Sequence, residues 1–386
     1  MRALIAFDKF KDALTAADAC ALTARAVSER HPDWQIECCP LTDGGEGFCS
    51  ILTHAIGGRL EAQTVSGPRG ECVTAPIGWA RWRDLPAEAR ALLALPHSLA
   101  ADDTIAIIEM AAASGLALLS PAQRDPWRTT SRGTGELLQI AAAAGARAIV
   151  LGVGGSATND LGLGALEPFG VRLMARDGAD LGSTVPGHWR DTVRIVSRPG
   201  LHSVPIRIAC DVTNPLLGPT GCTAVYAPQK GLAPADLAEM EKQAARMAVL
   251  LCEATGSPPT ITESPGAGAA GGIAFGLGAA LGARLLSGFA LVDAWLGLDE
   301  KLRRADLVIT GEGTFDASSL SGKGCGALAL RGAALGKRVH VFAGRVNVGA
   351  PTGLQLHALT PAAMPLAEAL PQASVFLSRA LAATFA

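Results

Sequence analysis

Aromatic residues are scarce in this chain, and so is any excess of charge of one sign. Phe, Trp and Tyr make up 4% of the 386 residues, and 33 basic side chains nearly balance 35 acidic ones, for a formal net charge of −2. No block of Lys and Arg stands out, so the sequence has no electrostatic footprint for nucleic acid. We therefore expect a protein that handles small molecules.

Paired cysteine motifs and long apolar runs are missing as well. The nine cysteines are odd in number and none forms a C-x-x-C pair, so neither a disulfide framework nor a zinc site is expected. The apolar run at 3–7 is five residues long, which is too short for a secretory signal. The uncharged stretch 266–283 is mostly Gly and Ala, which makes a membrane span a poor interpretation. These absences predict a cytoplasmic protein without a membrane partner.

Several common catalytic signatures are absent too. The sequence has no H-E-x-x-H zinc motif, no G-x-S-x-G nucleophile elbow and none of the protein-kinase motifs. The S-G-K-G segment at 321–324 contains the Gly-Lys of a Walker A loop, but Ala317 stands where that loop begins with Gly, and Gly324 replaces its Ser or Thr. If ATP is used, another arrangement of loops must hold it.

Glycine, by contrast, is abundant, and the two ends of the chain share one pattern. The 45 glycines suit an α/β protein with many tight strand-to-helix turns, and 386 residues suggest two domains. At both ends strands alternate with helices, which indicates a parallel sheet. The T-A-A-D segment from Thr15 is a capping box with Asp in place of Glu. The strands predicted for the ends are 2–7, 35–39, 305–310, 339–342 and 355–359, and the helices begin at Thr15 or cover 46–56 and 371–383.

The middle of the chain has a different pattern. It begins with a hairpin whose turn is G-P-R-G at 67–70, and it continues through an irregular stretch, 81–103. Apolar residues recur every four positions from Ile273 to Leu285, which predicts a helix there. The other predicted elements are the hairpin strands within 61–80, strands at 104–110, 148–153 and 207–210, and helices at 135–144 and 234–255. We interpret the chain as an α/β protein, with a discontinuous Rossmann-like parallel-sheet domain (1–60 and 291–386) and a second α/β domain (61–290) inserted into it.

Seven segments combine glycine with charged or amide side chains. Most follow a predicted strand, and ligands bind at that end of open α/β sheets. Glycine lets the backbone approach phosphate oxygens, the following helix offers free N–H groups, and carboxylates there can hold Mg²⁺ or act as bases. The segments are 8–11, 43–47, 152–160, 210–215, 228–231, 311–316 and 321–324.

Two segments also fit a dinucleotide fingerprint. G-V-G-G-S-A at 152–157 matches G-x-G-x-x-A, and G-A-G-A-A-G at 266–271 matches G-x-G-x-x-G. The first continues into the polar T-N-D, and no strand ending in an acid follows about 20 residues later. The second follows prolines rather than a strand. A nicotinamide-dependent hydroxy-acid dehydrogenase therefore stays a weaker alternative, as does a non-catalytic sensor of small anions.

As an ordered set, these motifs resemble the type I glycerate kinase family. The match runs through nearly the whole chain. Its departures include Lys9 for a usual Ser, Asp12 for a usual Gly, and Thr314 and Phe315 for an Arg-containing pair. The matching segments are D-K-F-K-D (8–12), D-G-G-E-G (43–47), I-E-M-A-A-A-S-G-L (108–116), T-S-R-G-T-G-E (130–136), G-G-S-A-T-N-D (154–160), C-D-V-T-N-P-L (210–216), P-Q-K-G (228–231), G-A-A-G-G (268–272) and I-T-G-E-G (309–313).

The resemblance implies ATP- and Mg²⁺-dependent phosphorylation of D-glycerate, usually at the 2-hydroxyl, by two α/β domains with the site in the cleft between them. The departures lie beside expected site residues, so a kinase for a related, larger hydroxy acid is a further alternative.

For the chemistry we expect a base, a cation for the substrate carboxylate and a phosphate cradle. Asp211 or Asp160 is the expected base and the other the Mg²⁺ partner, with Lys11 as a third catalytic residue. Four other carboxylates compete for these two roles, and the sequence does not rank them: Asp8, Asp43, Glu312 and Asp316. The residues expected to bind substrate are Asp8, Lys11, Asp43, Lys230 and Arg345. Those expected to bind the nucleotide are Gly154, Gly155, Ser156, Thr158, Asn159, Gly268, Gly271, Glu312 and Lys323.

Overall fold

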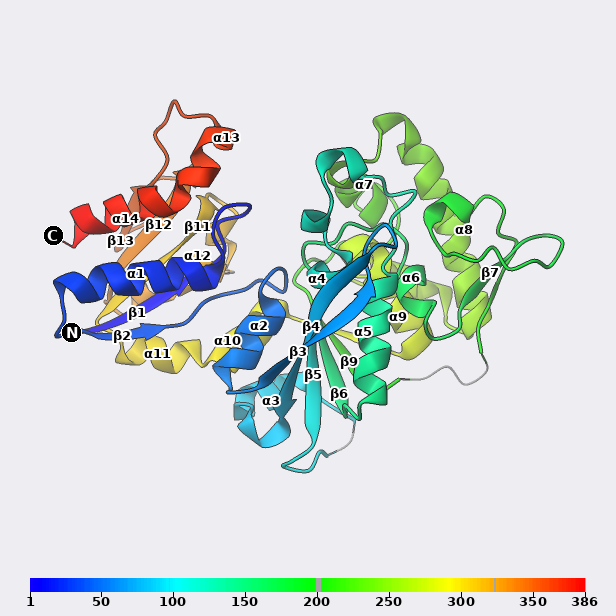
Figure 1. The fold of residues 1–386 in the computed structure, drawn as a ribbon, viewed down its shortest axis with the longest axis horizontal. Helices are drawn as coiled ribbons and strands as arrows, with labels where there is room; N and C mark the ends of the chain where they lie inside the picture. The colour runs from blue at the N-terminus through cyan, green and yellow to red at the C-terminus, as the bar shows by residue number, and fades with distance from the viewer. Residues whose placement is uncertain (97, 199–202, 323, 386) are drawn as a thin grey trace. The chain divides into compact units, whose positions relative to one another are not determined.

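The chain divides into two compact units (Figure 1). The computed structural model describes residues 1–96, 98–198, 203–322 and 324–385. The first unit combines Met1–Asp43 with Val292–Ala386, and the second is Gly44–Leu291. The first border therefore lies between Asp43 and Gly44, whereas the sequence placed it after residue 60. The second border lies after Leu291, one residue from its expected place.

The first unit contains a five-stranded sheet in which all neighbouring strands are parallel. Its order is β2-β1-β11-β12-β13, which is the 2-1-3-4-5 order of one doubly wound fold rather than the 3-2-1-4-5-6 order of the Rossmann fold. The strand order therefore reverses between β1 and β11, and the crevice beyond their carboxyl ends is the expected ligand site. The strands are β1 (Arg2–Phe7), β2 (Gln35–Cys38), β11 (Leu307–Phe315), β12 (Arg338–Val346) and β13 (Leu354–Ala358).

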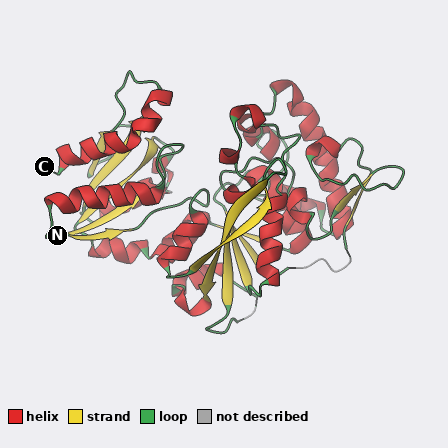
Figure 2. Ribbon diagram, viewed as in Figure 1, coloured by secondary structure: helices red, strands yellow, loops and turns green. Residues whose placement is uncertain are grey.

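Helices cover both faces of this sheet (Figure 2). Alternate residues of β1, such as Ile5 and Phe7, form a core with α1 (Ala16–Arg30) and α14 (Ala373–Thr384). The other face of the sheet packs against α11 (Leu298–Arg304) and α12 (Gly324–Ala334). Thr15 caps α1 as predicted, because its hydroxyl accepts the Asp18 N–H at 3.1 Å.

The second unit contains a six-stranded mixed sheet in the order β10-β9-β6-β5-β4-β3. The first four strands are parallel, and β4 and β3 form the predicted antiparallel hairpin at one edge. A separate antiparallel pair consists of β7 (Arg172–Met174) and β8 (Arg194–Val196). The six strands are β3 (Arg59–Ser66), β4 (Cys72–Arg81), β5 (Thr104–Glu109), β6 (Ala148–Gly152), β9 (Ile206–Ala209) and β10 (Arg284–Leu286).

One face of this sheet carries the larger core. Alternate residues such as Ile108, Leu151 and Ile208 pack there against α5, α8 and α9. The opposite face is covered near the hairpin by α2, which contacts β4 and β5. The helices are α2 (Phe48–Ala55), α3 (Ala87–Leu93), α4 (Met110–Ser114), α5 (Arg132–Ala143), α6 (Leu163–Leu166), α7 (Cys222–Tyr226), α8 (Leu237–Thr255) and α9 (Ala269–Leu281). The border after Leu291 falls within α10 (Gly288–Leu296), and α13 (Leu366–Ala369) belongs to the first unit.

Two local expectations were wrong. The stretch expected to be irregular contains α3, whose Ala89 and Leu93 are fully buried. Leu285 was expected on a helix but lies in β10, because Gly282 takes a left-handed conformation that ends α9. Among the described residues, no helix is long and apolar enough to cross a membrane.

Candidate active site

Two of the glycine motifs meet at the carboxyl end of β6. The N–H of Gly154 donates to the carbonyl of Gly44 at 3.0 Å. A Cβ on Gly152 would lie 2.6 Å from that carbonyl oxygen, and one on Gly154 would lie 2.7 Å from the Cα of Gly45. Because no side chain fits between these two backbones, the glycines are required for the contact. The D-G-G-E-G and G-G-S-A-T-N-D segments therefore form one Gly-lined surface.

Asp160 ends the second of these segments and is fully buried. Its carboxylate accepts four hydrogen bonds, from the N–H and hydroxyl of Ser131 at 2.7 Å each, and from the N–H groups of Gly162 and Gly164 at 3.2 Å. Burial raises the pKa of Asp160, and these hydrogen bonds act in the opposite direction. The carboxylate thus joins the starts of α5 and α6 to the loop after β6, and so holds these three segments in position.

Lys230 lies behind the same loop. Its side chain is almost fully buried, and its ammonium donates to Ser156 Oγ at 2.9 Å and to the Thr158 carbonyl at 2.6 Å. Burial lowers the pKa of Lys230 to about 8. The sequence offered this cation, after Lys11 and before Arg345, for the substrate carboxylate. In the structure it bonds to one hydroxyl and one backbone carbonyl of the Gly-rich loop.

The G-A-A-G-G segment at 268–272 packs against the Gly-rich loop at Thr158 and Leu161. Three successive residues, Ala270, Gly271 and Gly272, have φ values of 52°, 73° and 88°, in the left-handed region. The carbonyl of Gly271 accepts the Leu161 N–H at 2.9 Å, and a Cβ on Gly271 would lie 2.0 Å from the Thr158 carbonyl oxygen. Gly271 therefore allows two loops to touch, and Ala270 is strained for a residue with a side chain.

Two buried polar atoms in the loop have no hydrogen-bond partner among the described residues. They are Oγ1 of Thr158 and Oδ1 of Asn159, and both side chains are fully buried. The amide nitrogen of Asn159 does have a partner, Thr223 Oγ1, at 3.3 Å. Unsatisfied buried polar atoms are uncommon in folded proteins, so they mark a place where a polar ligand or water fits.

Asp211 lies after β9, at the same end of the sheet. Its carboxylate accepts the hydroxyl of Ser287 and the N–H of Phe289, both at 2.8 Å. Ser287 directly precedes α10 and Phe289 lies in its first turn, so Asp211 also stabilises the start of a helix.

In the first unit, Asp8 lies at the point where the strand order reverses. It follows β1, and its N–H donates to the Gly311 carbonyl of β11 at 2.9 Å. Burial is the largest cause that raises the pKa of Asp8, the charges of Asp43 and Glu312 also raise it, and Lys9 lowers it; together they place the pKa at about 7. An ordinary aspartate has lost its proton well below that pH, so Asp8 can take up and release a proton near neutrality.

The surroundings of Asp8 are charged. Lys9 Nζ pairs with Asp43 at 3.1 Å, and the buried thiol of Cys325 donates to Glu312 Oε1 at 3.0 Å. Burial keeps the pKa of Cys325 far above its ordinary value, so this group is a thiol donor rather than a thiolate. The structure thus brings three expected site residues, Asp8, Asp43 and Glu312, into one electrostatic cluster.

Other expected residues of the first unit are dispersed or outside the described part. Lys11 is exposed, and the guanidinium of Arg345 donates to the Met364 carbonyl at 3.4 Å. Lys323 lies outside the described residues. Phe315 is fully buried, so this departure from the family motif belongs to the core.

The dinucleotide alternative does not fit the local structure. After β6 the next helix, α6, begins at Leu163, six residues beyond the G-x-G-x-x-A segment, so this segment does not open a helix. The second segment follows a 3₁₀ turn, Pro259–Glu263, instead of a strand. Among the described residues, no three His, Cys, Asp or Glu side chains converge on a metal-binding arrangement.

Comparison with known proteins decides the family. A model of the glycerate kinase family matches residues 3–386. The chain belongs to the glycerate kinase family. Membership makes it a kinase that transfers phosphate to an alcohol group.

Individual relatives agree with this assignment. The chain is 38% identical over 327 residues to the glycerate 2-kinase of Escherichia coli (strain K12), covering 84% of this chain and 80% of the relative. It is 36% identical over 391 residues to the glycerate kinase of Bacillus subtilis (strain 168), covering 98% and 95%. A crystal structure assigned to glycerate kinase 2 of Salmonella typhimurium LT2 is 34% identical, covers 100% of this chain and 97% of that chain, and has a TM-score of 0.73. The expected α/β fold class is confirmed.

Two contributors to these sites were missed by the sequence reasoning. Ser131, which anchors Asp160, lies inside the T-S-R-G-T-G-E motif, so its motif was found but its role was not. Cys325 lies on α12 and had no sequence signal, because a single cysteine gives no indication of the carboxylate it faces.

Proposed function

We propose that this protein uses ATP and Mg²⁺ to phosphorylate D-glycerate at the 2-hydroxyl, giving 2-phosphoglycerate. The observation that carries the proposal is the family match over 3–386, and the glycerate 2-kinase of Escherichia coli among the relatives favours the 2-position. The fold supports it, because both sheets place glycines and carboxylates at the carboxyl ends of parallel strands.

The Gly-rich loop of the second unit is proposed to hold the phosphates of ATP. Gly154 gives the loop its close contact with the backbone of Gly45, and the buried ammonium of Lys230 fixes the loop from behind. The unpartnered oxygens of Thr158 and Asn159 fit a polar ligand group there. Mg²⁺ in kinases is held by one or two carboxylates together with substrate phosphates, and it neutralises developing charge. Asp211 remains the proposed carboxylate partner.

For the proton of the glycerate hydroxyl, we favour Asp8 over Asp160 and Asp211. Asp160 accepts four hydrogen bonds in a fully buried position, and Asp211 accepts two from the start of α10. Asp8 has a pKa of about 7 and lies at the switch point of its sheet. In the proposed step the hydroxyl oxygen bonds to the γ-phosphorus, its proton passes to Asp8, and ADP departs with the electrons of the broken P–O bond.

The reaction is tested by ADP release with glycerate and related hydroxy acids, followed by NMR of the product. ADP release that requires D-glycerate, with the phosphate on the 2-hydroxyl, is the expected result. A strong preference for a larger hydroxy acid would replace the substrate while keeping the chemistry. Reduction of NAD⁺ or NADP⁺ without ADP release would favour the dehydrogenase.

The base is tested by the pH dependence of kcat/KM. We expect an acid limb with a midpoint near pH 7, and Asp8→Asn should lower kcat/KM by ~10²-fold or more, the scale of general base catalysis. Two neighbouring substitutions should move that limb in opposite directions. Asp43→Asn removes a negative charge and should move it to lower pH, whereas Lys9→Met removes a positive charge and should move it to higher pH. An acid limb that keeps its midpoint in both variants would exclude Asp8.

A further inference from the structure

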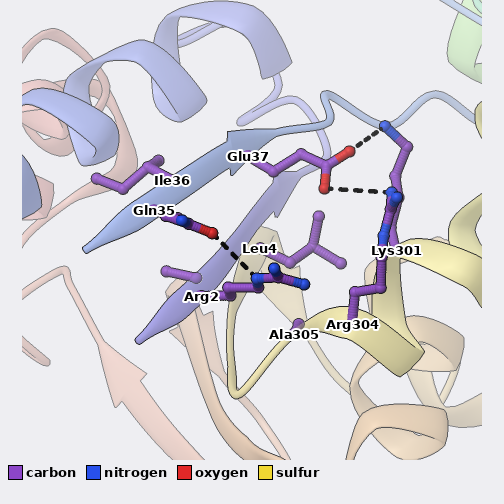
Figure 3. A pocket seen from close by; sticks show the side chains of 9 residues that line it. Arg2, Leu4, Gln35, Ile36, Glu37, Lys301, Arg304 and Ala305 are labelled. Carbon is purple, nitrogen blue, oxygen red and sulfur yellow. Dashed lines mark hydrogen bonds and ion pairs between the residues drawn. The ribbon is translucent and has the colours of Figure 1, made fainter.

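A cavity with several charged lining residues lies in the first unit, away from the carboxyl ends of its strands (Figure 3). Its volume is about 270 Å³. It is formed by the amino ends of β1 and β2 and by the C-terminal part of α11. Because the expected active site lies beyond the opposite ends of the same strands, this cavity is separate from it.

Strand register explains how charged side chains come to line this cavity. Arg2 pairs with Gln35 and Leu4 with Glu37, and side chains two residues apart on a strand share one face. That face is the one toward α11, whose last turns supply Lys301. The side chains drawn in Figure 3 therefore come from two strands and a helix that are distant in sequence.

The lining has more positive than negative groups. Three cations, Arg2, Lys301 and Arg304, face one carboxylate, Glu37. Glu37 pairs with Lys301 at 2.6 Å and with Arg304 at 3.8 Å, so its charge is shared between two partners. Arg304 also contacts Glu300 at 3.2 Å, outside the lining.

Arg2 is exposed, and its side chain, unlike those of the other two cations, has no anionic partner among the described residues. Its Nε donates to the neutral oxygen of Gln35 at 3.0 Å and its backbone N–H donates to Asp306 at 2.8 Å, whereas no hydrogen bond or ion pair joins its terminal nitrogens to the described residues. A carboxylate on the edge strand β2 is a known device against edge-to-edge pairing, which explains Glu37. The terminal nitrogens of the Arg2 guanidinium beside it face no anionic partner within the cavity lining, so they are available to a ligand.

We propose that this cavity binds a small phosphate monoester. The two terminal nitrogens of Arg2 suit a bidentate contact with phosphate, Arg304 and Lys301 add positive charge, and Glu37 can accept a hydroxyl of the ligand. Its volume is below the usual range of about 300–1,000 Å³ for ligand pockets, which favours a short phosphorylated polyol over a nucleotide.

The test measures binding to the full-length protein by calorimetry, with sn-glycerol 3-phosphate and inorganic phosphate as probes. Arg2→Gln and Arg304→Gln should each weaken binding of sn-glycerol 3-phosphate by ~10-fold or more, the scale of losing one charge-assisted hydrogen bond. Arg303→Gln is the matched control, because Arg303 lies on the same helix, is exposed and does not line the cavity. Its affinity should equal that of the wild type.

A second comparison separates this site from the active site and from misfolding. Arg2→Lys keeps the charge but loses the fork, so it should bind more weakly than the wild type and more tightly than Arg2→Gln, with an unchanged melting temperature. Asp8→Asn should bind the probe as the wild type does. Equal affinity in Arg2→Gln, Arg303→Gln and the wild type would overturn the proposal, and so would the absence of saturable binding to the wild type. Comparable affinity for inorganic phosphate would show that the phosphate group alone is recognised, which supports the anion contact but overturns the role of Glu37.

Discussion

The ammonium of Lys230 donates a hydrogen bond to the hydroxyl of Ser156, which is 74 residues away in the sequence, at 2.9 Å. A second bond, at 2.6 Å, reaches the carbonyl of Thr158. Two points of one short loop are thus tied to a single buried cation. Removing that cation leaves a buried carbonyl unpaired, so the loop should lose its fixed shape.

Replacement of Lys230 by Met tests this positioning role. We expect kcat/KM to fall by ~10-fold or more, with a larger effect on the KM for ATP than for glycerate, because the loop is proposed to hold phosphate. Ser156→Ala removes one of the two bonds and should have a smaller effect. A raised KM for glycerate with an unchanged KM for ATP would instead return Lys230 to the substrate carboxylate.

Lys230 should also affect how the free energy of unfolding depends on pH above neutrality. The pKa of Lys230 is about 8 in the folded protein and 10.5 for an ordinary lysine, so the unfolded chain binds more protons between these values. The contribution of this group to the free energy of unfolding therefore rises with pH from 8 to 10.5, by roughly 3 kcal/mol in total. Urea unfolding across that range should show the rise in the wild type relative to Lys230→Met. A constant difference between the two would contradict the lowered pKa.

Asp160→Asn should act on stability. The amide can no longer accept all four hydrogen bonds, and one of its N–H groups would face the donors of Ser131 or a glycine. We expect a loss of about 2–4 kcal/mol in the free energy of unfolding, measured by urea titration. Ser131→Ala removes one donor and should cost less. Wild-type stability with abolished activity would place Asp160 in the chemistry after all.

The strained turn at the start of α9 makes a matched pair of substitutions possible. Ala270→Gly relieves a left-handed conformation and should stabilise the protein by roughly 1 kcal/mol. Gly271→Ala should destabilise it by at least about 2 kcal/mol, because its Cβ would lie 2.0 Å from the Thr158 carbonyl oxygen. Thermal unfolding of both variants checks the signs. Equal melting temperatures would mean that this turn relaxes freely.

A histidine pair in the first unit predicts sensitivity to acid. Nδ1 of His340 lies 3.0 Å from Nε2 of His357, and burial, followed by the charges of His357 and Arg338, lowers the pKa of His340 to about 4. The unfolded chain binds this proton near pH 6.5, so the stability from neutral His340 is present above pH 6.5 and lost as the pH falls toward 4. The loss should be roughly 1–2 kcal/mol between pH 7 and pH 4.5. Urea titrations at both pH values should show a smaller loss in His340→Gln than in a His188→Gln control.

Local sequence patterns predicted much of the secondary structure, for physical reasons that act within a few residues. The capping box at Thr15, the G-P-R-G turn and the left-handed Gly256 that ends α8 all depend on near neighbours. The apolar period gave a wrong prediction where pairing between distant strands decides the structure. Leu285 continues a four-residue apolar period but lies beyond Gly282, and parallel pairing with β9 places it in a strand.

The sequence alone therefore determined the family and the set of motifs, because the order of motifs along the chain can be read without knowing the fold. Tertiary structure decided what each charged residue does. In the folded protein the carboxylate of Asp160 accepts hydrogen bonds from several donors, and Lys230 donates to the backbone of a loop. Asp8 lies near other carboxylates, at the point where the strand order reverses. Burial and neighbouring charges set a pKa, and both depend on residues that are far apart in the sequence.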